Sequence, residues 1–148
     1  MRDRLREVLA GYEPQGIEKD DSLWPAAVLV LVYEHHGRHH VVFQINEDDS
    51  RKWNTVLVNI NNVQEELGSV DVAVVVIGPA LGMLKADALT ANRVQDAISA
   101  GVRFVACGNS MTAQHLTKDD MIDGIDYAKA GYVELMRLQQ AGWTYLRP

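Results

Sequence analysis

The sequence predicts an α/β fold, in which an open, mainly parallel sheet carries helices on both of its faces. Short runs rich in valine and isoleucine alternate with longer segments whose apolar residues have helical spacing. Strands that are joined through helices pair in parallel, and strands of nearly continuous apolar sequence are typical of sheets covered on both faces. A length of 148 residues fits one such domain.

The beginning of the chain is predicted to add a helix and a hairpin strand to one edge of this fold. Helical spacing of apolar residues indicates a short helix over residues 2–11. The runs Ala26–Tyr33 and His40–Ile45 are rich in β-branched residues, and the turn between them predicts a β-hairpin. We therefore divide the chain into an N-terminal extension, residues 1–38, and an α/β domain, residues 39–148.

The clearest helix of the sequence runs from Trp53 to Leu67, where apolar residues recur at spacings of three and four. Acidic and hydroxyl residues at 48–50 are candidates for its N-cap, and Gly68 follows its end. Strands are predicted over Val70–Ile77, Val102–Ala106, Ile125–Ala128 and Trp143–Leu146. Helices are predicted over Thr90–Ala100 and Gly131–Ala141, with a short helix over Asn109–His115 and a turn over Lys118–Met121.

Composition excludes several classes of protein. A net charge of −6 with only 14 Lys and Arg argues against direct binding of nucleic acid. The single cysteine excludes an internal disulfide framework and a cysteine-rich zinc site. The longest apolar run, Pro25–Tyr33, is about half of the roughly 20 residues that a membrane span needs. No export signal is apparent, so we expect no membrane association and a cytoplasmic protein.

Three loops follow the predicted strands, at residues 46–50, 78–90 and 107–110. Open α/β sheets bind their ligands beyond the carboxyl ends of the strands, so these loops are the candidate site. The only thiol of the chain, Cys107, lies in the last of them. The loop 78–90 opens with Gly-Pro-Ala-Leu-Gly and lacks the glycine patterns of phosphate-binding and dinucleotide-binding loops. We predict a structural turn there and no bound cofactor.

The position of Cys107 favours a reactive thiolate. Gly108, Asn109 and Ser110 lead from the strand into the next helix, and backbone N–H groups at a helix start stabilise negative charge. Asn109 and Ser110 are also candidates to donate hydrogen bonds to the sulfur. The alternative is a buried structural cysteine, because free cysteine is among the most frequently buried residue types.

Lys85 and His115 are the nearest candidates for a positively charged neighbour of the thiol. Lys85 lies in the loop that should flank the same strand ends, and His115 lies eight residues beyond the cysteine. For both, the alternative is an ordinary solvated surface residue. The histidines of the segment 35–40 are candidate ligands, because imidazole side chains bind zinc, nickel or copper. Adjacent strand residues point to opposite faces, however, so we predict a solvated turn and no metal site.

Six stretches of the chain, taken in order and spacing, carry a family resemblance: Val41–Ile45, Trp53–Gly68, Ile77–Leu81, Gly101–Ser110, Ala130–Val133 and Gly142–Pro148. Residues 39–148 resemble the DsrE/DsrF-like family, which includes small sulfur-relay subunits. The resemblance implies a three-layer sandwich in which Cys107 accepts sulfane sulfur as a persulfide. It also implies a homo-oligomer, a trimer or a hexamer, and a protein partner that donates or accepts the sulfur. The competing interpretation is a non-catalytic oligomeric binding or structural module whose cysteine is only structural.

The N-terminal extension carries a second, shorter resemblance. The segments Leu5–Pro14 and Pro25–Val32 resemble the opening of Nudix hydrolases of the coenzyme A pyrophosphatase type. No Nudix box follows anywhere in the chain, so the glutamates that would hold the catalytic Mg²⁺ are absent. We therefore expect no pyrophosphatase activity.

Overall fold

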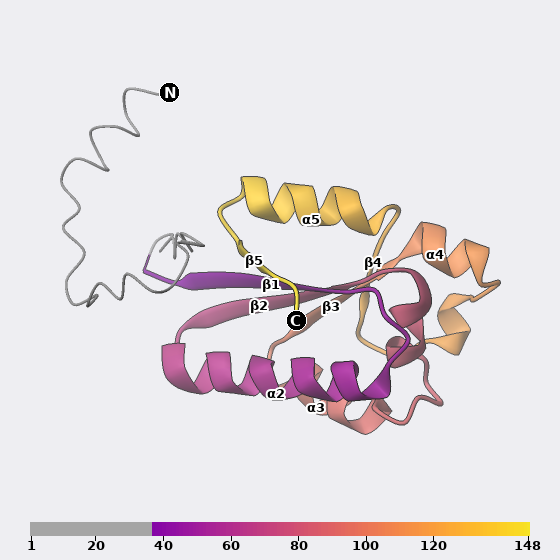
Figure 1. Cartoon of the computed structure of the whole chain (residues 1–148), viewed down its shortest axis with the longest axis horizontal. Helices are drawn as coiled ribbons and strands as arrows, with labels where there is room; N and C mark the ends of the chain where they lie inside the picture. The colour runs from indigo at the N-terminus through magenta and orange to yellow at the C-terminus, as the bar shows by residue number, and fades with distance from the viewer. Residues whose placement is uncertain (1–36) are drawn as a thin grey trace, which may run out of the picture.

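A computed structural model describes residues 37–148 of the chain, and these residues form a five-stranded sheet between helices (Figure 1). The strand order is β4-β3-β2-β1-β5, and every pair of neighbouring strands is parallel. The predicted α/β fold with a mainly parallel sheet is therefore confirmed. The strands are β1 (His39–Ile45), β2 (Val70–Val76), β3 (Arg103–Cys107), β4 (Asp126–Ala128) and β5 (Thr144–Leu146).

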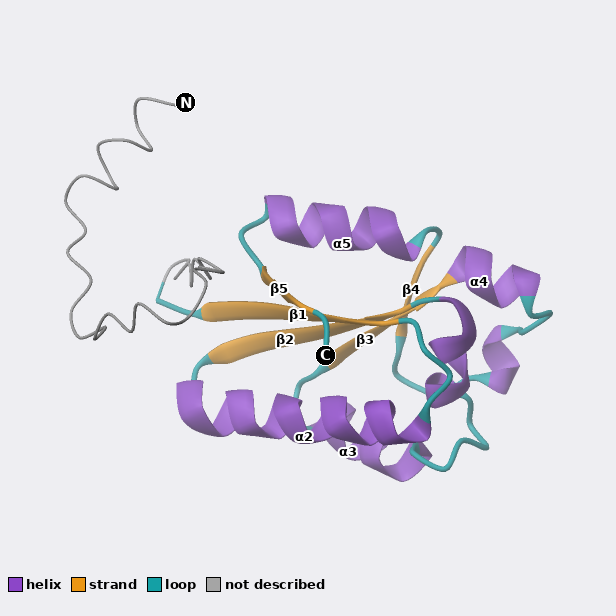
Figure 2. Cartoon of the chain, in the orientation of Figure 1, coloured by secondary structure: helices purple, strands orange, loops and turns teal. Residues whose placement is uncertain are grey.

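Helices cover both faces of the sheet, as Figure 2 shows. Helices α2 and α3 lie on one face, α5 lies on the opposite face, and α4 lies beside the end of the sheet where β3 finishes. Two short 3-10 helices complete the described part of the chain. The bounds are α2 (Ser50–Leu67), η1 (Gly78–Leu84), α3 (Ala91–Ser99), α4 (Gly108–Ala113), η2 (Lys118–Asp120) and α5 (Gly131–Gln140).

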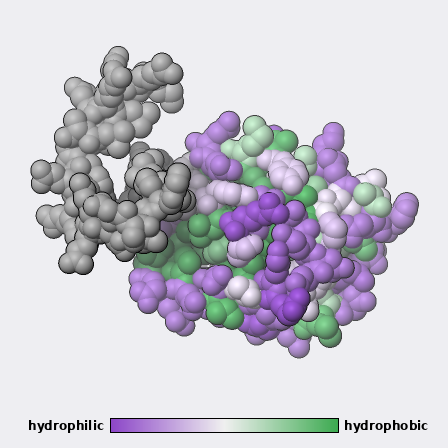
Figure 3. Space-filling view, in the orientation of Figure 1, coloured by the Kyte–Doolittle hydropathy of each residue, from purple (hydrophilic) through white to green (hydrophobic). Residues whose placement is uncertain are grey.

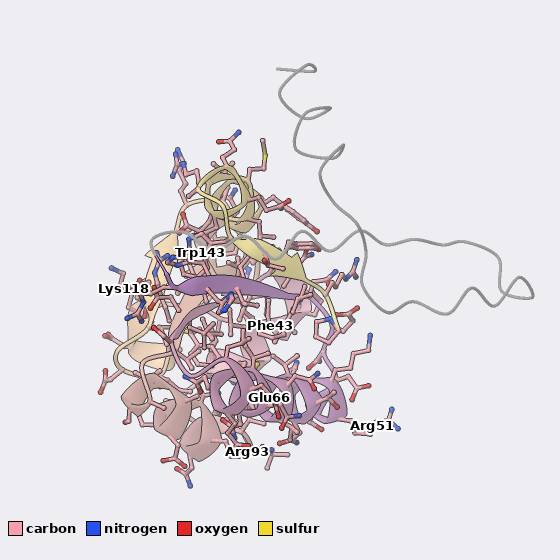
Figure 4. All side chains as sticks on the ribbon, turned by 90° about the vertical axis from the view of Figure 1, so that its left-hand side faces the viewer. Phe43, Arg51, Glu66, Arg93, Lys118 and Trp143 are labelled. Atoms are coloured by element: carbon pink, nitrogen blue, oxygen red, sulfur yellow. The ribbon has the colours of Figure 1, made fainter. Side chains whose placement is uncertain are left out.

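The strands are apolar on both sides because successive residues enter two different cores. Val74 and Val76 of β2 pack on the side of α2 and α3, whereas Val75 packs on the side of α5. Phe43 of β1 points toward α2 in Figure 4 and is 2% exposed. The period of two along a strand thus accounts for the unbroken valine runs of the sequence.

Helix α2 begins and ends near the predicted residues. The carboxylate of Asp49 accepts a hydrogen bond from the backbone N–H of Arg51 at 2.9 Å, which is a standard N-cap. Gly68 follows the last helical residue with a φ of +64°. Leu67, which we predicted on the apolar face, is 39% exposed. The buried face consists of Trp53, Val56, Leu57 and Ile60, so Leu57, one turn after Trp53, joins the predicted apolar stripe.

The segment after β2 is more ordered than the predicted turn. It forms the 3-10 helix η1, in which Pro79 lies in the first turn and has a backbone angle already suited to a helix. Ala80, Leu81, Met83 and Leu84 are all buried in the core between the sheet and the helices. The glycine and proline residues mask this helix in the sequence, whereas burial of the apolar side chains stabilises it.

Helix α5 is the connection between the two edges of the sheet. Strands β4 and β5 lie at opposite edges, so α5, which joins them, crosses the whole face between. Its first residue, Gly131, is buried against β2 and β3. A Cβ added to Gly131 would lie 2.7 Å from Cγ1 of Ile77 and 3.2 Å from Cβ of Cys107. Only glycine lets the start of the helix approach the sheet so closely.

Two groups of predictions lie outside the described residues: the helix over 2–11 and the first arm of the hairpin, Ala26–Tyr33. The second arm is β1, which lies between β2 and β5 with both neighbours parallel to it. Across residues 37–148, every helix is too short or too polar to cross a membrane. Polar residues cover much of the face drawn in Figure 3, with smaller hydrophobic areas between them.

Replacing Gly131 by alanine is expected to lower the free energy of unfolding by about 1–3 kcal/mol, because the added methyl group overlaps Ile77. Chemical denaturation measures the change. Gly108→Ala is the matched control, since Gly108 also begins a helix but its added Cβ would lie 3.3 Å from the Ala128 carbonyl oxygen. A loss for Gly131→Ala no larger than the loss for Gly108→Ala would contradict this packing argument.

Candidate functional site

The three loops predicted to form the site line one open cleft at the carboxyl ends of the strands. Asp48 follows β1, Gly78 and Pro79 follow β2, and the first turns of α4 follow β3. The cleft has a volume of about 610 Å³. Its lining residues are Asp48, Gly78, Pro79, Asn109, Ser110, Ala113 and Gln114.

Cys107 lies beneath this cleft rather than on its surface. It is the last residue of β3 and the N-cap of α4, and only 4% of it is exposed. Its side chain packs on the α5 side of the sheet, in the core that includes Val105 and Leu135. The sulfur is therefore at a helix start, as predicted, but it is covered in the resting structure.

Polar hydrogens face the sulfur from two helices. The backbone N–H of Gly131, at the start of α5, donates to Sγ of Cys107 at 3.3 Å. From α4, the hydroxyl of Ser110 and the backbones of Ser110 and Asn109 lower the pKa of Cys107, while the N–H of Asn109 donates to the Lys129 carbonyl at 3.0 Å. Because both helices present their N-terminal ends to the sulfur, their dipoles favour a negative charge there.

These contacts decide the ionisation of the thiol. Burial is the largest single influence, and it opposes the charged form and would raise the pKa of Cys107. The hydroxyl of Ser110, followed by the N–H groups of Gly131, Ser110 and Asn109, acts in the opposite direction. The combined effect places the pKa of Cys107 below its ordinary value. The stabilising groups are neutral hydrogen-bond donors, so no charged neighbour is needed.

The structure brings Asn109, Ser110 and Gly108 next to the thiol and places the two cationic candidates elsewhere. Lys85 pairs with Asp87, its Nζ lying 3.2 Å from Oδ1 of that residue. The backbone of Lys85 bridges to Met121, which ties it to the far end of η2. His115 is exposed just beyond α4, with a φ of +56°.

The histidine segment lies at the opposite end of β1 from the cleft. His39 and His40 open the strand, whereas His35 and His36 fall outside the described residues. Nδ1 of His40 lies 3.2 Å from Oδ2 of Asp71, and its ring lies 5.2 Å from the ring of Trp143. Within residues 37–148, no three His, Cys, Asp or Glu side chains are grouped closely enough to hold a metal ion.

Gly131 is the site residue that sequence reasoning missed. It is separated from Cys107 by 24 residues, and no local motif joins the two positions. The only signal in the sequence was a glycine at the start of the predicted helix Gly131–Ala141, shortly after the predicted strand Ile125–Ala128. The sequence does not say which strand lies beside the one that ends at Cys107, so it does not place this glycine near the sulfur.

The family of this chain is identified by comparison with models of known protein families. The family model described as DsrE/DsrF-like matches residues 39–148. The chain belongs to the DsrE/DsrF-like family. The match begins where β1 begins, and it includes Cys107 and both helices that face its sulfur. A search of curated proteins gave no match.

Solved structures agree with the family. A protein of unknown function, MTH1491 from Methanobacterium thermoautotrophicum, shares 34% identity with a TM-score of 0.72, over 74% of this chain and 98% of that one. BT1422 from Bacteroides thetaiotaomicron, also of unknown function, has 12% identity and a TM-score of 0.62, over 74% and 94%. The ychN protein from E. coli has 14% identity and a TM-score of 0.61, over 74% and 97%. The last two likenesses concern the fold alone.

Membership of the DsrE/DsrF-like family suggests a role in sulfur relay, which is the activity that a lone activated cysteine suits. The hydrogen-bond donors around Cys107 lower its pKa, which favours the thiolate.

Removing the Ser110 hydroxyl is expected to raise the pKa of Cys107, because the thiolate loses a hydrogen-bond donor. The rate of alkylation by iodoacetamide, measured against pH, gives the midpoint for Ser110→Ala and for the natural chain. Thr112→Ala is the matched control, since its hydroxyl lies on the same helix and donates to the Gly108 carbonyl at 3.1 Å. Equal midpoints for all three proteins would rule out the assigned role of Ser110.

Proposed function

We propose that this protein is a sulfur carrier, which accepts sulfane sulfur on Cys107 as a persulfide and passes it to a protein partner. The observation that carries the proposal is the set of hydrogen-bond donors around the sulfur. The start of α5 donates the Gly131 N–H to Sγ, and Ser110 and Asn109 at the start of α4 lower the pKa of Cys107. This arrangement favours the thiolate, which is the nucleophilic form of cysteine.

Sulfur transfer at Cys107 requires no external oxidant or reductant. In the first step, the Cys107 thiolate attacks the outer sulfur of a donor persulfide. A new S–S bond forms on Cys107 while the donor S–S bond breaks, and the donor sulfur leaves as a thiolate with the electron pair. In the second step, an acceptor thiolate attacks the outer sulfur on Cys107, and the Cys107 thiolate leaves in the same way.

Access is the condition that this chemistry imposes. A donor must contact Sγ, yet only 4% of Cys107 is exposed. Two segments lie next to the sulfur: the start of α5, through the N–H of Gly131, and the start of α4, of which Cys107 is the N-cap. Movement of either segment would expose the sulfur, whether it opens spontaneously and admits a small donor or is displaced by a docked protein partner.

The partner we propose is a protein. The net charge of −6 opposes direct binding to a polyanion such as tRNA. The surface of α5 supports assembly into the homo-oligomer that the family resemblance implies. Three of its large apolar side chains are well exposed: Tyr132 at 58%, Val133 at 43% and Met136 at 57%.

A structural role for Cys107 is the second candidate, and its burial is the observation that favours it. The side chain fills space between Ile77, Val105 and Leu135 in the core beneath α5. In that case the protein is a non-catalytic oligomeric module, and the thiol contributes only to packing. The two candidates differ in whether the folded protein takes up sulfur.

Incubation of the folded protein with glutathione persulfide is expected to add the mass of one sulfur atom, which a reducing agent then removes. Mass spectrometry of the intact chain measures the addition. Because the chain has a single cysteine, the site of the adduct is unambiguous, and Cys107→Ala is expected to show none. Uptake by the urea-unfolded chain but not by the folded protein would favour the structural candidate.

Met136→Glu is expected to shift the protein toward the monomer, because a charge on the exposed apolar face of α5 opposes its burial between copies. Light scattering coupled to gel filtration gives the molar mass. Gln140→Glu places the same charge on an exposed polar position of the same helix and serves as the control. An unchanged oligomer in the Met136 variant would exclude this face of α5 as the interface.

A further inference from the structure

Gly78 is tied to α4 on both sides of its α-carbon. Its backbone N–H donates to Oγ of Ser110 at 2.8 Å. Its carbonyl oxygen accepts from Nε2 of Gln114 at 2.7 Å. Ser110 and Gln114 are four residues apart, and the N–H of Gln114 donates to the Ser110 carbonyl, so the two side chains lie on one face of the helix. Residues 110 and 114 therefore hold Gly78 between them.

The backbone conformation of Gly78 depends on these two hydrogen bonds. Its φ of +60° lies in the left-handed region, which glycine enters without strain. Glycine is also the residue with the greatest backbone freedom, so this turn is held by its contacts rather than by its own preference. The bond from Gln114 fixes the peptide group after Gly78, and the bond to Ser110 fixes the one before it.

The Ser110 hydroxyl connects this turn to the reactive sulfur. A serine hydroxyl has one hydrogen to donate and two lone pairs that accept. With the Gly78 N–H bound to a lone pair, the hydrogen is left to donate toward Cys107, the N-cap of α4, which lies three residues before Ser110. The same hydroxyl lowers the pKa of that thiol. The orientation of the hydroxyl thus depends on where the Gly78 N–H points.

We propose that Gln114 is a positioning residue for the sulfur of Cys107, acting through Gly78 and Ser110. Gln114 itself lies on the surface and lines the cleft, and its bond to the Gly78 carbonyl keeps the N–H of that residue aimed at Ser110. The inference rests on the proposed role of Cys107 as the reacting group. It adds a residue that does not touch the sulfur and yet controls a donor to it.

The test is the alkylation of Cys107 by iodoacetamide against pH in Gln114→Leu. The ratio of the rate at neutral pH to the plateau rate at high pH is expected to fall roughly two- to tenfold, the size of one lost hydrogen bond. Gln140→Leu removes an exposed glutamine from α5 and is expected to leave the ratio unchanged. A ratio in Gln114→Leu equal to that of the natural protein would overturn the proposal.

The double variant separates positioning from a general effect on the fold. If Gln114 acts through Ser110, then adding Gln114→Leu to Ser110→Ala is expected to cause no further change in the pH profile. A full additional shift in the double variant would show that Gln114 acts by another route and would overturn the proposal.

Alkylation needs no sulfur donor, so this result is independent of sulfur transfer. A shifted profile in Gln114→Leu supports the positioning role even if glutathione persulfide adds no sulfur to the natural protein, an outcome that contradicts only the carrier function. Normal sulfur uptake with an unmoved profile contradicts the positioning role and leaves the carrier function standing.

Discussion

The close approach of α5 to the end of β3 is the constraint on which this structure depends. Gly131 lies against Ile77 and Cys107 at distances that no side chain permits. The same approach brings the N–H of Gly131 within 3.3 Å of the sulfur. One backbone contact therefore closes the core on this face of the sheet and sets the electrostatic surroundings of the thiol. A substitution at Gly131 would therefore change both the packing against Ile77 and the hydrogen bond to the sulfur of Cys107.

The groups that favour the thiolate of Cys107 are neutral hydrogen-bond donors. Burial acts against the thiolate, and hydrogen-bond donors act for it. Such donors are strong when water is excluded, since a low local dielectric strengthens each bond. The covering of Cys107 and the polarity around it are thus parts of one arrangement. A more exposed sulfur would be easier to reach but would be held less firmly by the same groups.

The sequence was sufficient for the order of the strands and main helices, because the central strands β1, β2 and β3 are buried on both faces and each main helix has an apolar stripe. Cys107, Asn109 and Ser110 are neighbours along the chain, so the sequence alone brings them together as candidates. It failed where the relation is created by strand order alone. Gly131 reaches the sulfur because β4 lies beside β3, and Gly78 reaches Ser110 because β2 lies on the other side. Lys85 shares a loop with Gly78, but the 3-10 helix η1, which the sequence did not reveal, lies between them, and the Lys85 side chain pairs with Asp87.

The position of β5 has a consequence for how the chain reaches this state. β1 is the first strand of the described domain and β5 the last, yet they are neighbours in the sheet, with Val41 opposite Thr144. During synthesis, β2 follows β1 closely, whereas β5, which pairs with the other edge of β1, is the last of the described strands to be made. Pairing between such distant segments slows folding, because a long loop must be closed first. Removal of Thr144–Leu146 would take away the strand that pairs with this edge of β1 and would expose its backbone groups to other chains.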